Sequence, residues 1–262
     1  MRCTVLASGS KGNCLLVEGS SGDLLVDAGI SAKETFRRLA SAGKGPERIR
    51  AILVTHEHGD HISGVDVLSR RLNAPVFATE GTLNNFLEFR RMSTGSITVA
   101  ACRYHEGFSV GDFTIEAFAT SHDSAEPCGF ILRENGITLG VCTDTGLITA
   151  KMMESLHRCD GLVLESNHCP MMLKEGPYPE YLKRRIRSAR GHLSNAGAAE
   201  CLSQLGRDVP VVVLAHLSEV NNTPGKAIAS ARNGLGLLYD QTTVIVASQR
   251  GTSPENPQQI SL

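Results

Sequence analysis

Three histidines and one aspartate crowd into the stretch THEHGDHISG, residues 55–64. They are His56, His58, Asp60 and His61. Neutral imidazoles bind zinc, manganese, iron and other first-row ions, and carboxylates add hard oxygen ligands to such a site. A polar surface loop could carry these residues too, but H-x-H-x-D-H should arise by chance in only about one of several thousand chains of this size. The spacing therefore predicts a metal site.

The flanking sequence predicts where this cluster lies. IRAILVTH, residues 49–56, is an apolar run rich in β-branched side chains, and HISGVDVLSRRLN, residues 61–73, has helical spacing. The cluster is thus expected on a strand-to-helix loop. Such loops, at the carboxyl ends of strands, are where α/β proteins hold ligands.

Other predicted strands also end in a potential ligand. Asp27 closes LLVD, His122 closes AFATSH, Asp144 closes LGVCTD and His216 closes VVVLAH. Each alone is weak, since Asp27 could equally be a strand-end cap, but the ordered set indicates one site. Cys142 could share a side of its strand with Asp144, although a buried thiol is the commoner role. Two cations about 3.5–4 Å apart can activate a shared water and stabilise the attacking and leaving oxygens, which suits phosphodiester hydrolysis.

Composition limits the class of protein. The chain has 262 residues, 41% of them hydrophobic, which is enough for a packed core. Its formal net charge of −1 excludes a strongly basic, histone-like protein, so any nucleic-acid contact must come from a local patch. The eight cysteines include no C-x-x-C pair and are expected to be reduced thiols. We find no signal peptide and no apolar run of about 18 residues, which predicts a cytoplasmic protein with no membrane contact.

Short apolar segments alternate with helical ones, which predicts an α/β fold. The expected strands include 14–18, 23–29, 51–56, 75–79, 114–122, 160–167 and 209–217. The expected helices lie near 31–42, 60–72, 80–91, 149–157, 179–190, 194–205 and 223–233. A hairpin should turn at Asn135-Gly136. With no proline- or glycine-rich linker, we expect one domain, residues 1–252, and a loose polar tail, residues 253–262.

The ordered ligand candidates resemble the motifs of the metallo-β-lactamase superfamily. LASGSKGNC, CTDTG, LESNH and GHLSN more narrowly resemble the YycJ/WalJ group of bacterial metal-dependent hydrolases. The resemblance implies a four-layer αβ/βα sandwich with a metal groove at one edge of its two sheets. The gap between Asp144 and His216 is too short for the extra domain of β-CASP nucleases. The implied ligands are His56, His58 and His122 for one metal and Asp60, His61 and His216 for the other, with Asp144 bridging them and Asp27 bracing the loop.

The resemblance also implies a reaction. It points to a dinuclear phosphodiesterase on nucleic acid, with DNA favoured and 5′-to-3′ exonuclease activity implied by the YycJ/WalJ group. The two divalent ions would be Zn²⁺ or Mn²⁺, with Fe²⁺ as a further option. His192 is similar to a histidine that helps protonate the leaving alkoxide in tRNA 3′-processing endonucleases, Glu165 would orient it, and Asp60 belongs to the same catalytic set.

Two other functions stay open. One is a phosphodiesterase for a small cyclic or nucleotide substrate, and a thioesterase or lactamase ranks below it. The other is a metal-bound regulatory module linked to cell-wall signalling. No stable protein partner is predicted.

A basic run in YLKRRIRSARGH suggests how a polymer could bind. It contains Lys183, Arg184, Arg185, Arg187 and Arg190. On a helix, Lys183, Arg187 and Arg190 would share one face, which could hold phosphates or simply be solvated. Further candidates for substrate binding are Ser8, Ser10 and Asn13 in the SGSKGN turn, together with Asn167 and His168, for which structural roles are equally good explanations.

Overall fold

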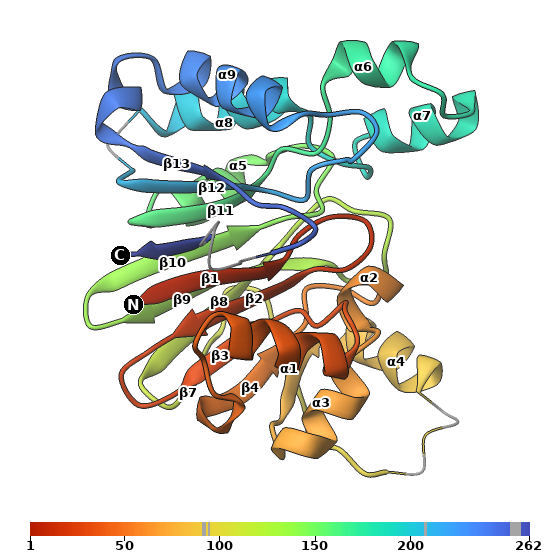
Figure 1. The fold of residues 1–262 in the computed structure, drawn as a ribbon, viewed down its shortest axis with the longest axis vertical. Coiled ribbons are helices and arrows are strands. Elements are labelled where there is room, and N and C mark those ends of the chain that lie inside the picture. Colours follow the sequence, from red (N-terminus) through yellow and green to blue (C-terminus); the bar gives the residue numbers. More distant parts are fainter. Residues whose placement is uncertain (91–92, 94, 207–208, 252–257) are drawn as a thin grey trace.

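The computed structural model of the protein describes residues 1–90, 93, 95–206, 209–251 and 258–262. Two β-sheets face each other at the centre, and helices cover the outer side of each sheet (Figure 1). The chain is therefore a four-layer αβ/βα sandwich, as the resemblance implies. Among the described residues, no helix combines the length and apolar character needed to cross a membrane.

The first sheet has the order β14-β1-β2-β3-β4-β5-β6. The strands are β1 (Arg2–Ala7), β2 (Cys14–Glu18), β3 (Asp23–Val26), β4 (Ile49–Leu53), β5 (Val76–Thr79), β6 (Val99–Cys102) and β14 (Gln259–Ser261). Strands β3 to β6 run parallel, so their carboxyl ends lie at one edge of the sheet.

The second sheet has the order β13-β12-β11-β10-β9-β8-β7. The strands are β7 (Gly107–Val110), β8 (Phe113–Ala119), β9 (Cys128–Glu134), β10 (Ile137–Cys142), β11 (Gly161–Glu165), β12 (Val211–Ala215) and β13 (Thr243–Val246). Strands β10 to β13 are parallel, and β8 runs in the same direction because it is antiparallel to β9, which is antiparallel to β10. At the β9–β10 turn, Asn135 and Gly136 both have positive φ (52° and 79°), which confirms the predicted hairpin.

The helices flank the sheets. Those that pack on the first sheet are α1 (Ala32–Ser41), α3 (Val65–Leu72) and α4 (Glu80–Phe89). Those that pack on the second are α5 (Ala150–Leu156), α8 (Asn195–Leu205) and α9 (Pro224–Leu235). The remaining helical segments are α2 (Gly59–Ile62), α6 (Pro170–Glu175) and α7 (Glu180–Arg187), with short 3₁₀ turns at Pro46–Arg48 and Gly236–Gln241.

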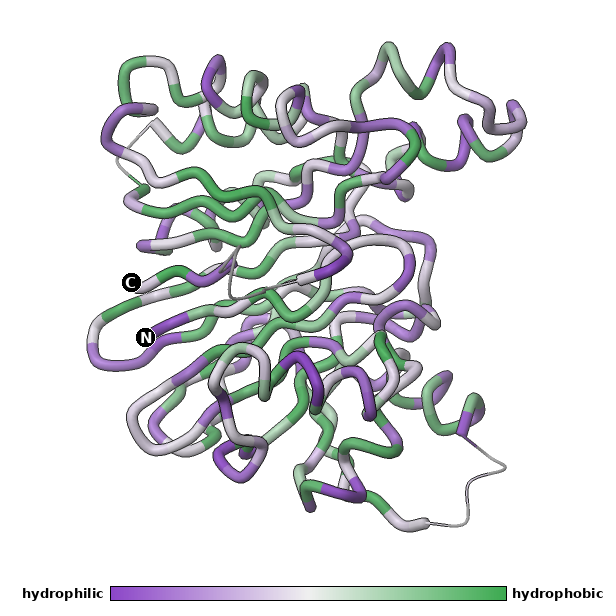
Figure 2. Tube along the Cα trace, in the orientation of Figure 1, coloured by the Kyte–Doolittle hydropathy of each residue, from purple (hydrophilic) through white to green (hydrophobic). Residues whose placement is uncertain are grey.

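The alternation of side chains along β12 shows how the layers form. Val211 and Val213 face the core between the sheets, whereas Val212 and Leu214 face the helices. A strand covered on both faces must be apolar at every position, which explains the continuous run VVVLA. Figure 2 shows the same distribution across the molecule, with hydrophobic residues concentrated along the strands and hydrophilic residues on outer loops and helices.

Three expectations need correction. The helix expected over 60–72 is interrupted, because α2 ends at Ile62 and α3 begins at Val65. The helix expected over 179–190 ends at Arg187, since Ser188 adopts an extended conformation. The prediction of a loose tail is wrong at Gln259–Ser261, which pair with the open edge of β1 while Ile260 is buried in the core. Residues 253–257 of that tail lie outside the described residues.

Candidate metal centre

The potential ligands gather because the strands that carry them end at one edge. Asp27 follows β3 and His56 follows β4, two parallel neighbours in the first sheet. His122 follows β8, Asp144 follows β10 and His216 follows β12, three strands that run in one direction in the second sheet. Residues far apart in the sequence therefore meet between the two sheets.

The first ligand group consists of His56, His58 and His122. His58 Nδ1 lies 3.1 Å from His56 Nε2 and 3.2 Å from His122 Nε2. A tetrahedral ion with metal–nitrogen bonds of about 2.0–2.1 Å keeps its ligand nitrogens about 3.3 Å apart. The three imidazoles are thus spaced as ligands of one ion.

The second group consists of Asp60, His61 and His216. Asp60 Oδ2 lies 3.6 Å from His61 Nε2 and 3.5 Å from His216 Nε2. Asp144 faces both groups, because its Oδ2 is 3.4 Å from His61 Nε2 and its Oδ1 is 3.8 Å from His122 Nε2. One carboxylate between two ligand groups has the position of a bridge.

Two polar atoms in this cluster support a fit to metal ions. Asp144 Oδ2 and His216 Nε2 are buried and have no hydrogen-bond partner among the described residues. An unpaired buried acceptor or donor costs about 1–3 kcal/mol. Coordination to a cation would satisfy both atoms, so the mixed nitrogen and oxygen donors fit divalent metals.

Neighbouring groups fix the orientation of the imidazoles. His61 Nδ1 lies 2.8 Å from Asp27 Oδ2, and Asp27 also accepts hydrogen bonds from the Thr55 amide and hydroxyl. His122 Nδ1 is 2.9 Å from the Gly191 carbonyl oxygen, to which it must donate. In the neutral rings these contacts place the proton on Nδ1 and leave Nε2 unprotonated, as coordination to a metal requires.

Burial and charge set the protonation of the cluster. Burial lowers the pKa of His56 well below its usual value, and the neighbouring histidines lower it further. Burial acts in the same direction on His61, but Asp27, Asp144 and Asp60 outweigh it and raise its pKa to about 9. The two ligand groups therefore differ in charge when no metal is bound.

Three residues of the cluster share an unusual backbone conformation. Asp27, Asp144 and His216 have φ values of 59°, 55° and 55°. Non-glycine residues adopt the left-handed region at a cost, so it persists only where the surroundings impose it. Each of these residues turns the chain sharply after a buried strand, and this turn presents its side chain to the cluster.

His192 and Glu165 form a second pair beside the ligands. His192 Nδ1 lies 2.8 Å from Glu165 Oε1, and the same oxygen is 3.2 Å from His216 Nδ1. Glu165 is fully buried, which would raise its pKa, but His192 and His216 outweigh burial and lower it. His192 lines a cavity of about 310 Å³ together with Ser10, His58, Asp60 and Asp144.

The basic run is more dispersed than expected. Arg185 pairs with Asp123 at 2.5 Å, and the buried Lys183 donates to the Lys174 carbonyl oxygen. Arg190 lies beyond the end of α7, where its Nε donates to the His122 carbonyl oxygen. The predicted shared face of Lys183, Arg187 and Arg190 is therefore wrong.

Arg184 and Arg187 are exposed. Arg187 approaches Glu180 only at 3.9 Å, a weak contact at the surface.

Three other candidates contact the metal ligands directly. The Ser8 hydroxyl accepts from the His216 amide at 2.7 Å, and the Asn13 side-chain nitrogen is 3.0 Å from His61 Nε2. Asn167 donates to the His216 carbonyl oxygen at 2.9 Å and also lines the cavity. Cys142 packs in the core beneath the helices and joins none of the ligand groups found among the described residues.

Several residues around the site were not singled out from the sequence. Thr55 braces Asp27, and the position directly before His56 could have suggested it. Tyr178, Leu182 and Ile186 line the metal cavity from the α6–α7 region. Tyr178 lies between α6 and α7, and the other two lie on α7. Nothing in their local sequence marks them as cavity residues, because only the tertiary fold brings them to the ligands.

Comparison with known proteins places this site in a family. A family model described as "Beta-lactamase superfamily domain" matches residues 23–217. The protein named Exodeoxyribonuclease WalJ from Streptococcus pneumoniae serotype 2 (strain D39) is 37% identical over 251 residues, covering 90% of this chain and 93% of that protein. Exodeoxyribonuclease YycJ from Bacillus anthracis is 39% identical over 221 residues, covering 84% of this chain and 83% of that protein.

Solved structures agree on the fold. Zn²⁺-bound PqqB from Methylobacterium extorquens matches with a TM-score of 0.74 at 16% identity, with both chains fully covered. YhfI from Bacillus subtilis, described as a metallo-β-lactamase fold protein, matches with a TM-score of 0.72 at 17% identity, covering 96% of this chain and 98% of that one. The chain belongs to the metallo-β-lactamase superfamily and, within it, to the group of metal-dependent hydrolases related to WalJ and YycJ.

Proposed function

We propose that this hydrolase is a dinuclear exodeoxyribonuclease that removes nucleotides from DNA in the 5′-to-3′ direction. The observation that carries the proposal is the position of Asp144 between the two ligand groups, beside the His192–Glu165 pair. Relatives at 37% and 39% identity carry the name exodeoxyribonuclease, which supports DNA as the substrate.

The proposed roles follow from the contacts. His56, His58 and His122 would hold one ion, Asp60, His61 and His216 the other, and Asp144 both. Zn²⁺ or Mn²⁺, with Fe²⁺ as a further option, would activate a water and stabilise charge on the phosphate.

Proton transfer falls to His192. Its Nδ1–H donates to Glu165. This bond fixes the orientation of the ring and leaves the other nitrogen, Nε2, available for proton transfer. When protonated, Nε2 can donate to the oxygen that leaves the phosphate. Glu165 stabilises the imidazolium that donates this proton. It is a positioning residue, because its Oε1 contacts His192 and His216 while its Oε2 accepts from the Thr145 and Leu193 amides.

Single-stranded DNA labelled at either end tests the reaction. Metal-reconstituted protein should release labelled mononucleotide at once from a 5′-labelled strand and only late from a 3′-labelled strand. RNA, cyclic nucleotides and a chelator-treated sample serve as controls. Turnover of cyclic nucleotides alone would favour the small-molecule phosphodiesterase, and bound metal without turnover of any diester would favour a regulatory module.

His192→Ala tests the proton donor. DNA expels an alkoxide, which is a poor leaving group, so loss of the acid should slow its cleavage roughly 10²–10⁴-fold. Bis(p-nitrophenyl) phosphate expels a stable phenolate and should lose far less activity. Metal content should stay unchanged. Equal losses on both esters, with metal retained, would rule out this role, and loss of metal would make His192 a ligand.

Two expectations stay predictions: a cytoplasmic location and the lack of a stable protein partner.

A further inference from the structure

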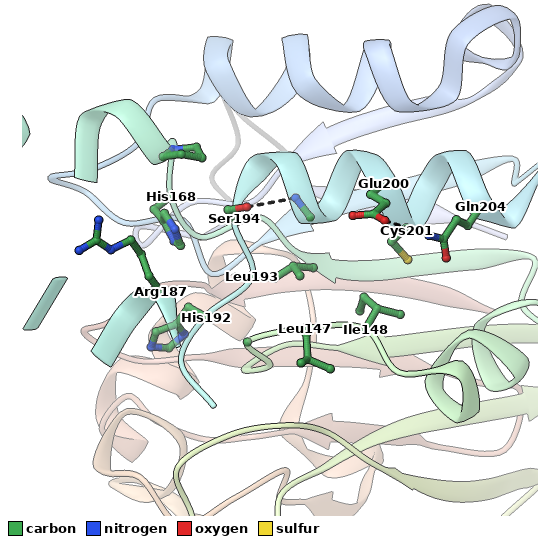
Figure 3. Close-up of a pocket in the computed structure, with 13 residues that line it drawn as sticks. Leu147, Ile148, His168, Arg187, His192, Leu193, Ser194, Glu200, Cys201 and Gln204 are labelled. Carbon is green, nitrogen blue, oxygen red and sulfur yellow. Dashed lines mark hydrogen bonds between the residues drawn. The ribbon is translucent and has the colours of Figure 1, made fainter. Parts of the chain in front are cut away.

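A second cavity, of about 360 Å³, adjoins the metal centre and shares His192 with it (Figure 3). One end is lined by His168, Arg187 and His192. From there it extends along α8 toward Glu200 and Gln204. Its volume lies in the range of pockets that hold small molecules.

The middle of this cavity is apolar. Leu147 and Ile148, from the segment between β10 and α5, lie on one side, and Cys201 on α8 lies on the other (Figure 3). Leu193 completes the lining between them. Leu147 is 38% exposed, a considerable fraction for a leucine beside a polar active site. Apolar side chains on opposite sides suit the two faces of a flat aromatic ring.

The far end is polar and carries a negative charge. Gln204 Nε2 donates to Glu200 Oε1 at 3.1 Å, and both side chains are exposed. An amide and a carboxylate together offer hydrogen-bond donors and acceptors to the edge of a nucleobase. Glu200 would repel a phosphate there, so a nucleotide must place its phosphate at the opposite end, near Arg187 and His192.

His168 gives an independent indication of an occupant. Its side chain lines the cavity and is 3% exposed, yet its Nδ1 has no hydrogen-bond partner among the described residues. A buried ring nitrogen without a partner carries a free-energy cost. A sugar or phosphate oxygen at this end of the cavity would supply that partner.

We infer that this cavity binds the nucleoside on the leaving-group side of the phosphate that is cut. The inference rests on the proposed function, in which His192 protonates the oxygen that this nucleoside carries. Because His192 belongs to both cavities, a nucleoside bonded to that oxygen can extend directly from the metal centre into this space. For 5′-to-3′ cleavage the occupant is the terminal nucleotide, which explains release of one nucleotide at a time.

Paired DNA substrates test the inference. The two strands are identical except that one lacks the base on the leaving-group side of the cut. Metal-loaded wild-type protein should cleave the abasic strand roughly ten- to a hundredfold more slowly, since the stacking and edge contacts of that base are lost. The double variant Leu147→Ala, Gln204→Ala should cleave both strands at the slower rate. Leu237→Ala, at a site 95% exposed outside the cavity, is the matched control and should keep the preference.

Binding of mononucleotide gives a readout that does not depend on turnover. In metal-loaded protein, thymidine monophosphate should shift the methyl NMR signals of Leu147 and Ile148, whereas deoxyribose phosphate without a base should not. Equal cleavage of both strands together with unchanged methyl signals would overturn the pocket while leaving the exonuclease intact. Failure to cut any DNA, with the methyl shifts present, would instead overturn the proposed function and keep a nucleotide site.

Discussion

The two ligand groups of the metal centre use the same type of side chain in different surroundings. In the first group, His56 lies against the Thr55 hydroxyl and His122 donates to the Gly191 carbonyl oxygen, both uncharged partners. In the second, His61 contacts Asp27 and His216 contacts Glu165, both buried carboxylates. Burial lowers the pKa of the first pair, whereas nearby carboxylates overcome burial and raise the pKa of the second.

The difference shows that ligands of the same residue type can start from different protonation states when they bind a metal. Imidazoles must be neutral to coordinate a cation. His56 and His122 are already neutral near pH 7, while His61 and His216 must release protons. The carboxylates that stabilise the protonated rings would, in return, strengthen metal binding once the metal has replaced those protons. Burial thus favours metal binding by the first group because it keeps His56 and His122 neutral, and nearby carboxylates favour it in the second because their negative charge attracts the cation.

The largest effect is expected from Asp144→Asn, which removes the charge shared by the two groups. Both ions should be lost, and DNA cleavage should fall roughly 10³-fold or more, as when a preorganised electrostatic stabiliser is removed. Asparagine tolerates the left-handed backbone found there, so the fold should persist. Elemental analysis and circular dichroism check this, with the exposed Asp112→Asn as control. Retention of both ions would show that Asp144 is no bridge.

Asp27→Asn should separate the two groups. The substitution removes the negative charge beside His61. Asp27 reaches the first ligand group only indirectly, through Thr55. Affinity for one ion should fall about 10–100-fold while the other is held as before. Titration against a chromogenic chelator would resolve the two steps. A uniform loss at both steps would mean that the groups act as one.

The pH dependence of metal-free protein should reveal the charged group. His61 has a folded pKa of about 9, against about 6.5 in an unfolded chain. Its contribution to stability is therefore complete below about pH 6.5 and is lost as pH rises through about 9. Urea unfolding of chelator-treated wild type and His61→Gln should show a stability difference that shrinks over this range. A difference independent of pH would place His61 with the neutral group.

The smallest effect is expected outside both groups. Arg184→Ala with Arg187→Ala should weaken binding of single-stranded DNA a few-fold and reduce its log–log salt slope by about 0.7 per lost phosphate contact. Neither metal should be affected. Anisotropy of labelled DNA in the slow His192→Ala background, which should keep both metals, measures this binding. Arg185→Ala is the comparison, and it should matter less because Asp123 already neutralises that charge.

The sequence predicted the ligand candidates at the strand ends well, but it predicted poorly the segments that pack around them. A doubly covered strand such as β12 must be a continuous apolar run, so the polar residue after it, His216, is visible in the sequence. The chain just after α7 is held by the distant Ser121 and His122, and β14 pairs with β1 from the other end of the chain. The same holds for Ser8, whose partner His216 is 208 positions away. Such contacts leave no local pattern to read.

The left-handed backbone at Asp27, Asp144 and His216 also restricts how this centre can change during evolution. Bulky and β-branched side chains disfavour that conformation, whereas glycine, asparagine, aspartate and histidine accept it most readily. A substitution that changes the metal preference must therefore first be compatible with the left-handed backbone, and only then can its coordination chemistry matter. The accessible alternatives at these three positions form a short list, composed mainly of the residue types that already occupy them.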